Sequence, residues 1–401
     1  MQTSRLEVSD RSKLLKESPI RKLVPFADAA RRAGKTVYQL NIGQPDIPTI
    51  PAMRKAYENA PEVLAYGPSQ GLDELINKFH GYYRNKGIEV NKEDVFITTG
   101  GSEAIIFALM AIGSAGDEVI VPEPYYANYN GFAAMVGLRI VPVSTTLENN
   151  FHLPDIEDFA AKIGPRTKAI LFSNPGNPTG AVFSKEKLQA LADLARKKDL
   201  YLISDEVYRE FTYGEREAVS VLQLEGVEEH ALMVDSVSKR FSACGARIGT
   251  LVSRNHRVLD LVMRFAQARL CPPTLDQVAA AAALEDPEEY LDQVRREYKQ
   301  RRDHFVKGLS DIEGVRVSSP EGAFYLIAEL PVDDSEAFAE WLLSDFDLDG
   351  ETVMVAPAAG FYSSPGAGRR QIRLAYVLER NKLARSVEIL REALKVYPGR
   401  E

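Results

Sequence analysis

One lysine of this sequence has neighbours that could turn its amine into a nucleophile. Lys239 follows two small hydroxyl residues, Ser236 and Ser238, and precedes Arg247 by eight positions. A lysine attacks a carbonyl group only after its ammonium loses a proton, which desolvation or a nearby cation promotes. Arg247 could provide that cation and also hold a phosphate. Taken alone, the segment favours a solvated basic pair after a strand. The rest of the chain decides between this interpretation and a reactive lysine.

Two further segments carry polar side chains directly after apolar runs. Asn177 lies in a proline- and glycine-rich turn after residues 168–172, and Asp205 and Tyr208 follow residues 201–204. Such turns leave the carboxyl ends of buried strands, where open α/β sheets bind ligands. A carboxylate there can keep a pyridine nitrogen protonated, while a phenol and an amide can hydrogen-bond a ring oxygen. These groups suit an aldehyde cofactor attached to Lys239.

A strand-to-helix turn contains Gly101 and Ser102. Its glycines let backbone amides and the positive end of a helix approach an anion, although a plain turn capped by Ser102 is the alternative. The turn matches neither the dinucleotide nor the Walker pattern, which disfavours a nucleotide-binding protein. The five histidines lack ligand spacing and the two cysteines form no Cys-x-x-Cys pair, so no metal site is predicted.

Four motifs, taken in order, resemble one known family. They are Asn-Pro-x-Asn-Pro-Thr-Gly at 174–180, Asp-x-x-Tyr at 205–208, Ser-x-Ser-Lys at 236–239 and Arg-x-Gly at 247–249. The chain resembles the pyridoxal-phosphate-dependent aminotransferases of fold type I, in the branch with the bacterial aspartate aminotransferases, from about residue 40 to residue 375. The resemblance implies pyridoxal 5′-phosphate as cofactor and ping-pong transamination, with Lys239 as the cofactor-bearing amine and proton carrier.

The resemblance also implies roles around the cofactor. It assigns the phosphate to a group of small residues and one arginine: Gly101, Ser102, Ser236, Ser238 and Arg247. Asp205 would hold the ring nitrogen, and Asn177 and Tyr208 the ring oxygen. Tyr126 would stack on the ring where many relatives have tryptophan, with its neighbour Tyr125 as the alternative.

Substrate and partner roles follow from the same resemblance. Gly43 would lie near the substrate carboxylate, and Arg373, together with Asn177, would bind the α-carboxylate through a planar guanidinium. Tyr66 would reach the phosphate of a neighbouring subunit, which implies a homodimer.

The substrate side chain is less well specified by the sequence. The arginine with which the best-known aspartate aminotransferases bind the side-chain carboxylate aligns with Ala266, and nearby Arg269 could replace it. Arg269 could equally be a basic residue at a helix end. We expect aspartate and glutamate, with oxaloacetate and 2-oxoglutarate, as substrates. An aromatic, alanine or broad-range aminotransferase and a lyase are the rivals.

The elements that must position these residues follow from apolar spacing. Strands are predicted at 95–99, 118–121, 168–172, 201–204, 231–234 and 248–252, with helices at 102–112, 132–136 and 184–197 between them. This alternation predicts a large α/β domain with a mainly parallel sheet covered by helices on both faces.

The rest of the chain, after the strands and helices of the large domain, is predicted to form a smaller α+β domain. Helices are expected at 255–269 and, as one long helix, at 275–309, with strands at 322–327 and 371–376. We assign residues 1–51 to an N-terminal arm and part of the small domain, 52–285 to the large cofactor-binding domain, and 286–401 to the small domain.

Composition narrows the classes of function. The 401 residues include 49 basic and 57 acidic ones, a net charge of −8, which argues against nucleic acid or anionic membrane as a main partner. Two cysteines suit a reducing cytoplasm, and neither a signal-peptide core in residues 1–22 nor an 18-residue apolar run occurs. A non-catalytic cofactor-binding sensor is disfavoured, because no DNA-binding module precedes Arg21 and Lys239 is intact.

Overall fold

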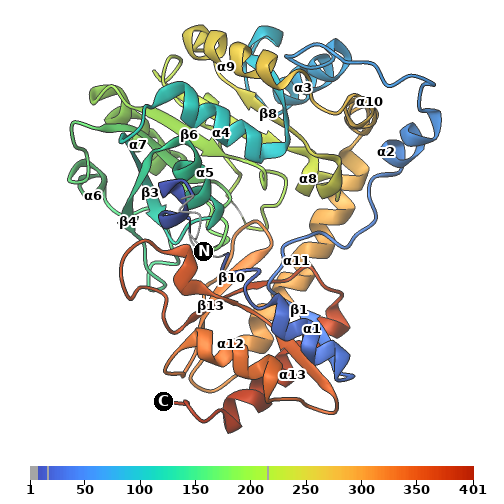
Figure 1. Ribbon diagram of the computed structural model, residues 1–401, viewed down its shortest axis with the longest axis vertical. Coiled ribbons are helices and arrows are strands. Elements are labelled where there is room, and N and C mark those ends of the chain that lie inside the picture. The colour runs from blue at the N-terminus through green and yellow to red at the C-terminus, as the bar shows by residue number, and fades with distance from the viewer. Residues whose placement is uncertain (1–7, 16–17, 215) are drawn as a thin grey trace, which may run out of the picture.

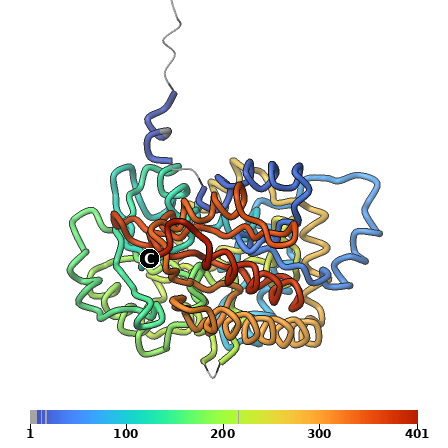
Figure 2. The backbone as a smooth tube through the Cα atoms, turned by 90° about the horizontal axis from the view of Figure 1, so that it is seen from below, coloured from blue at the N-terminus to red at the C-terminus, as the bar shows by residue number. Residues whose placement is uncertain are grey.

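The computed structural model describes residues 8–15, 18–214 and 216–401. Residues 1–7 and 16–17 of the predicted arm lie outside this range. Figure 1 shows an upper part built on a large sheet and a lower part built on a smaller sheet, with helix α11 (Glu288–Ser310) running between them. Seen from below, the short helix η1 (Asp10–Lys13) projects from the body (Figure 2).

The upper part contains a seven-stranded sheet with the order β2-β8-β7-β6-β5-β3-β4. Its strands are β2 (Val95–Thr99), β3 (Glu118–Glu123), β4 (Arg139–Ser144), β5 (Thr167–Ser173), β6 (Tyr201–Asp205), β7 (Ala231–Ser236) and β8 (Ile248–Val252). All neighbours pair in parallel except β8, which is antiparallel to β2 and β7. The six predicted strands are all present, and the predicted α/β class is confirmed. Strand β4, at one edge of the sheet, was not predicted.

Helices cover both faces of this sheet. The helices of the upper part are α2 (Pro51–Ala56), α3 (Asp73–Asn85), α4 (Gly100–Ile112), α5 (Asn128–Val136), α6 (Ile156–Ala160), α7 (Lys185–Lys197), α8 (Val237–Arg240), α9 (His256–Arg269) and α10 (Thr274–Ala283). Alternate β2 residues point to opposite faces: Phe96 belongs to a core cluster with residues of α4, α5 and α9, and Ile97 to a cluster with residues of α3, α7 and α10.

The predicted single helix at 275–309 is wrong. Helix α10 ends at Ala283 and α11 begins at Glu288, with Pro287 as its N-cap. Proline has no backbone N–H and is tolerated at a helix start but not in its interior. Pro287 therefore separates two helices.

The lower part is an antiparallel sheet with helices. Its strand order is β12 (Ala356–Pro357), β13 (Gln371–Ala375), β10 (Tyr325–Glu329) and β9 (Arg316–Val317), accompanied by α12 (Ser335–Ser344) and α13 (Arg380–Val396). Near the N-terminus, β1 (Thr36–Gln39) pairs with β11 (Glu351–Met354), and α1 (Val24–Arg32) packs on α12. The division near residues 51 and 285 remains a proposal.

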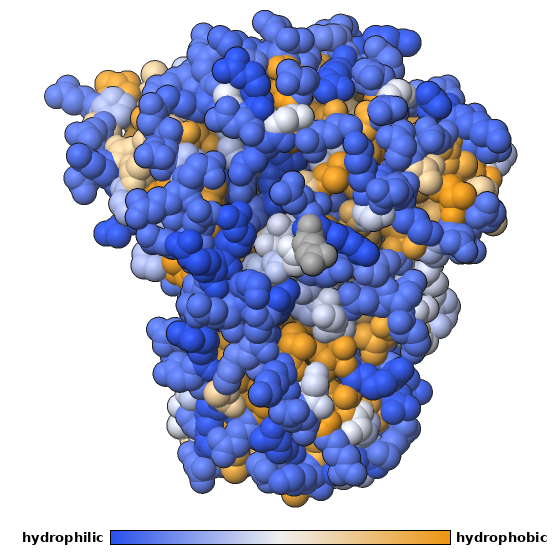
Figure 3. Space-filling model, turned by 180° about the vertical axis from the view of Figure 1, so that it is seen from behind, coloured by the Kyte–Doolittle hydropathy of each residue, from blue (hydrophilic) through white to orange (hydrophobic). Residues whose placement is uncertain are grey.

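The face of the molecule seen from behind is largely hydrophilic, with its apolar residues in separate patches (Figure 3). Within the described ranges, no helix combines the length and the apolar character needed to cross a membrane.

Candidate active site

A cavity of about 360 Å³ lies where the ends of the upper strands face the lower sheet. Strands β5, β6 and β7 run in parallel and end at the same edge, with Ser173 beside Asp205. The cavity brings together all the predicted site residues except Tyr66 and Arg269, namely Gly43, Gly101, Ser102, Tyr126, Asn177, Asp205, Tyr208, Ser236, Ser238, Lys239, Arg247 and Arg373.

Lys239 lies on α8, the short helix that follows β7. Its Nζ donates to the carbonyl oxygen of Gly43 at 2.8 Å and lies 3.7 Å from Cys244 Sγ. The next residue, Arg240, is buried, pairs with Asp235 at 2.5 Å and stacks on Tyr82. This buried ion pair fixes the turn that carries the lysine.

The predicted phosphate-binding residues form a cradle of backbone and guanidinium groups. Helix α4 begins at Gly100, and a Cβ on that residue would lie 2.4 Å from Arg247 Nη2. A Cβ on Gly249 would lie 2.5 Å from the Gly100 carbonyl carbon. Ser236 Oγ caps α8 by accepting from the Ser238 amide at 3.1 Å. Helix starts with exposed amides beside an arginine bind anions such as phosphate.

Asp205 is a buried carboxylate. Its Oδ2 accepts from the Tyr129 hydroxyl at 2.7 Å, and no ion-pair partner of Asp205 occurs in the described part of the chain. Burial raises the pKa of Asp205 to about 6, although the Tyr129 hydrogen bond opposes the rise. A cation placed beside this carboxylate would favour its ionised form.

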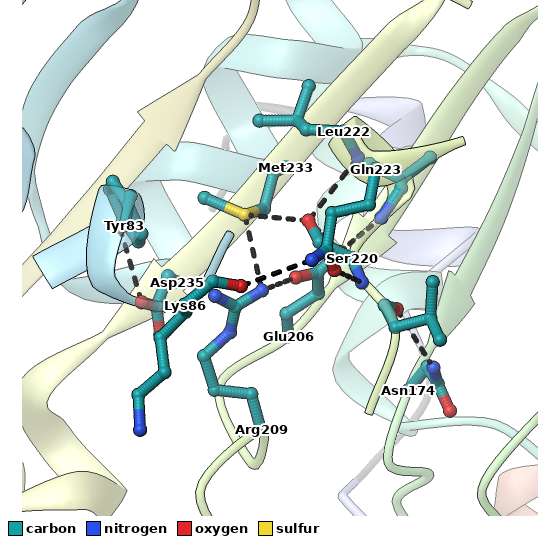
Figure 4. Close-up of polar contacts among 12 residues, drawn as sticks. Tyr83, Lys86, Asn174, Glu206, Arg209, Ser220, Leu222, Gln223, Met233 and Asp235 are labelled. Carbon is teal, nitrogen blue, oxygen red and sulfur yellow. Dashed lines mark hydrogen bonds and ion pairs between the residues drawn. The ribbon is translucent and has the colours of Figure 1, made fainter. Parts of the chain in front are cut away.

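The adjacent Glu206 points away from the cavity. It is not a lining residue of the cavity, and Figure 4 shows it among Arg209, Ser220 and Met233. It forms an ion pair with Arg209 and accepts from the Val221 amide at 2.8 Å. Asp205, and not Glu206, is therefore the acid available to a ligand in the cavity.

Aromatic side chains line the remaining wall. Tyr126 faces the cavity, while its alternative, Tyr125, is buried and hydrogen-bonds Asn130 and Ser363 outside it. The Tyr208 hydroxyl lies 2.8 Å from the Tyr325 hydroxyl, and burial raises the pKa of Tyr208 well above its ordinary value.

Arg373 is a buried cation on β13. It is 1% exposed, its Nη1 donates to Asn177 Oδ1 at 3.2 Å and its Nη2 to the Asn41 carbonyl. Its Nε has no hydrogen-bond partner among the residues that the structure describes, and burial lowers the pKa of Arg373. Its ring neighbours Tyr325 and Phe361 flank the guanidinium. This arrangement leaves donor capacity for a carboxylate that enters the cavity.

The structure does not bring Arg269 to the cavity. This residue ends α9, where Glu103 Oε1 lies 3.4 Å from its Nε and its Nη2 donates to the carbonyls of Ser69 and Ile97. These partners hold the guanidinium away from the cavity of its own chain, so a substrate contact of Arg269 stays a prediction. Tyr66 is also outside the cavity and 82% exposed.

Sequence reasoning missed several lining or supporting residues. Tyr129, which donates to Asp205, lies three residues after Tyr126 in the same aromatic segment. Arg21 and Tyr325 line the cavity and Asn41 accepts from Arg373, and none of them was predicted, because these contacts join segments that are distant in sequence.

These observations fit pyridoxal 5′-phosphate. The cradle beside Arg247 suits its phosphate, the uncompensated carboxylate of Asp205 suits a protonated ring nitrogen, and Lys239 suits its aldehyde.

Comparisons with known proteins agree with this geometry. The family described as aminotransferase class I and II matches residues 35–390. The chain is 30% identical over 395 residues to an aspartate aminotransferase of Pyrococcus horikoshii, with 97% of each protein covered. It is 30% identical over 399 residues to aromatic-amino-acid aminotransferase 2 of Thermococcus litoralis, with 97% of this chain and 99% of that protein covered. The solved aspartate aminotransferase of Thermus thermophilus with maleate gives a TM-score of 0.88 at 32% identity, covering 97% of this chain and 100% of that chain.

Proposed function

The chain belongs to the aminotransferase class I and II family, and we propose that it catalyses ping-pong transamination with bound pyridoxal 5′-phosphate, converting L-aspartate and 2-oxoglutarate to oxaloacetate and L-glutamate. The observation that carries the proposal is one cavity lined by a reactive amine, a buried carboxylate and a buried guanidinium: Lys239, Asp205 and Arg373.

Each of these side chains has a definable task. The cofactor supplies a ring that withdraws electrons from the substrate Cα. Arg373 binds the substrate α-carboxylate and thereby orients the Cα–H bond toward Lys239. Lys239 Nζ removes the proton from the substrate Cα. The same Nζ would then pass the proton to the cofactor carbon that is joined to the substrate amino nitrogen. Asp205 would hold the ring nitrogen of the bound cofactor and keep it protonated, and Tyr208 and Asn177 would donate to the ring oxygen.

The names of the relatives support the dicarboxylate preference, but they do not all agree. The Pyrococcus relative is named for aspartate, and the Thermus structure holds maleate, a dicarboxylate. The Thermococcus relative is named for aromatic amino acids, which favours an aromatic or broad-range aminotransferase as the second candidate.

A screen of single half-reactions tests the proposal. Each amino acid is mixed with the cofactor-loaded protein, and loss of absorbance from the lysine-bound cofactor is followed in a stopped-flow instrument. We expect aspartate and glutamate to react with the highest kcat/KM, and Lys239→Ala to bind cofactor without turnover. Faster reaction with aromatic or aliphatic amino acids would refute the dicarboxylate assignment. Absence of reaction with every amino acid would favour the sensor.

A further inference from the structure

The cavity contains a guanidinium that the proposed mechanism does not use. Among the described lining residues, the cationic ones are Arg21, Lys239, Arg247 and Arg373, and the acidic one is Asp205. Lys239 carries the reactive amine, Arg247 belongs to the phosphate cradle, and Arg373 suits the α-carboxylate. Arg21 is therefore the cation available to the far end of a substrate.

The backbone before Arg21 is attached to the α-carboxylate site. Arg373 Nη2 donates to the Asn41 carbonyl, and Asn41 Nδ2 donates to the Ile20 carbonyl at 2.9 Å. Pro19 is buried against the helix η6 (Ala358–Phe361), where a Cβ on Gly360 would lie 2.5 Å from the proline Cβ. Asn41 thus connects the peptide next to Arg21 to the guanidinium of Arg373.

Charge and exposure agree with a substrate contact. Within residues 18–214 and 216–401, no carboxylate lies within 4.0 Å of Arg21, whereas the next residue, Lys22, pairs with Glu336. Burial raises the pKa of Tyr126 to about 12, and the charges of Arg373 and Arg21 both oppose the rise, as expected if both face this hydroxyl. Arg21 is itself exposed, so it lies at the mouth of the cavity.

We propose that Arg21 binds the distal carboxylate of a dicarboxylic substrate and determines the preference for aspartate and glutamate over neutral amino acids. The inference rests on the proposed function. An exposed arginine can turn toward water when the substrate side chain is neutral, so alanine does not have to displace it from an ion pair. The cavity is also lined by apolar residues, among them Ile20 and Ile105, which a neutral substrate side chain could contact.

The test compares Arg21→Gln with wild type, using the cofactor-loaded protein. We expect kcat/KM for aspartate and glutamate to fall by more than about tenfold while kcat/KM for alanine changes by less than about twofold. Binding of succinate, a dicarboxylate without an amino group, should weaken by a similar factor in calorimetry, while binding of propionate should not. Lys22→Gln is the matched control, because it removes a neighbouring cation that faces Glu336, and it should leave all these ratios unchanged.

The outcomes separate the two proposals. If wild type itself prefers neutral substrates, the dicarboxylate function fails. If wild type prefers dicarboxylates and Arg21→Gln lowers kcat/KM equally for all substrates, or for none of them, only the proposed role of Arg21 is refuted. Arg21→Lys, which keeps the charge without the planar fork, serves as a second variant should Arg21→Gln not load cofactor, and it should retain part of the aspartate preference.

Discussion

Asp205 shows how one residue is prepared for a ligand by what surrounds it. Consecutive residues at the end of a strand point in opposite directions. Glu206 therefore pairs with the guanidinium of Arg209, whereas Asp205 accepts a hydrogen bond from the hydroxyl of Tyr129. Burial without a nearby cation disfavours the ionised carboxylate, which accounts for the raised pKa of Asp205. Binding a cationic ring would remove this cost, so the same group weakens the cofactor-free fold and strengthens cofactor binding.

We predict that Asp205→Asn makes the cofactor-free protein more stable above pH 6. The folded-state pKa of Asp205, about 6, lies above the ordinary 3.8, so the folded state binds more protons and its stability falls as pH rises between these values. The variant does not lose this stability, because its side-chain amide carries no charge at any of these pH values. A shift of roughly two pKa units corresponds to about 3 kcal/mol in the free energy of unfolding. Urea titrations at several pH values measure the difference.

The comparison has two internal checks. The stability gap should close below about pH 4, where Asp205 is protonated in both folded and unfolded chains. With pyridoxal 5′-phosphate bound, the order should reverse. A gap independent of pH, or a variant less stable than wild type without cofactor at pH 7, would contradict the desolvation argument.

The sequence predicted residues inside local motifs but not residues that join the site from a distance. Lys239, Asp205 and Asn177 lie next to strand ends, where chemistry and position can be inferred together. Arg21 and Arg269 illustrate the limit. Both are arginines near helix ends, and only the contacts of Asn41 and Glu103 decide which one reaches the cavity.

At the scale of elements, the crossing of β8 over the start of α4 builds the cradle that we propose for the phosphate. A Cβ on Gly249 would lie 2.5 Å from the Gly100 carbonyl carbon and 2.6 Å from the Gly101 nitrogen, closer than atoms can approach without backbone movement. The antiparallel β8 thus lies against the helix start, and glycine makes this possible.

We predict that Gly249→Ala weakens cofactor binding by more than about tenfold, because the added methyl displaces the first turn of α4. Overpacking of this kind typically costs about 1–3 kcal/mol. Gly245→Ala is the matched control, since a Cβ there meets nothing within 4 Å. Fluorescence titration with cofactor and thermal unfolding of the cofactor-free protein measure the two effects. Equal affinities in the two variants would show that the close approach is not needed.

Element boundaries were predictable where apolar runs are continuous and ends are marked by turn residues, as for β2 and β8. Two features were not. The break before α11 depends on one proline in an otherwise helical pattern. Strand β4 begins at the exposed Arg139 and contains Pro142, which interrupts its apolar run and is typical of an edge strand. The antiparallel direction of β8 follows from its connection to β7 through α8, which periodicity does not reveal.

At the scale of the whole molecule, the site depends on both parts of the chain. Lys239 and Asp205 come from the upper sheet, Arg373 from the lower sheet, and Arg21 from the segment before α1. Side chains from the upper and lower parts can contact the same substrate only if these two parts keep their relative position. Helix α11 and the hydrogen bonds of Asn41 and Arg373 maintain that arrangement.

We propose that the assembly is a homodimer in which Tyr66 completes the site of its partner, as the resemblance implies. Tyr66 is 82% exposed and follows Val63 and Leu64, which are 75% and 63% exposed, an apolar segment that a partner would cover. Tyr66→Arg and Lys239→Ala chains should each be inactive alone. When they are unfolded together and refolded, random pairing makes half of the dimers hybrids with one intact site of two, so activity should recover to about a quarter of wild type. Mixing either variant with itself is the control, and native mass spectrometry counts the hybrids. A fully active monomer in sedimentation, or hybrids without activity, would contradict the shared site.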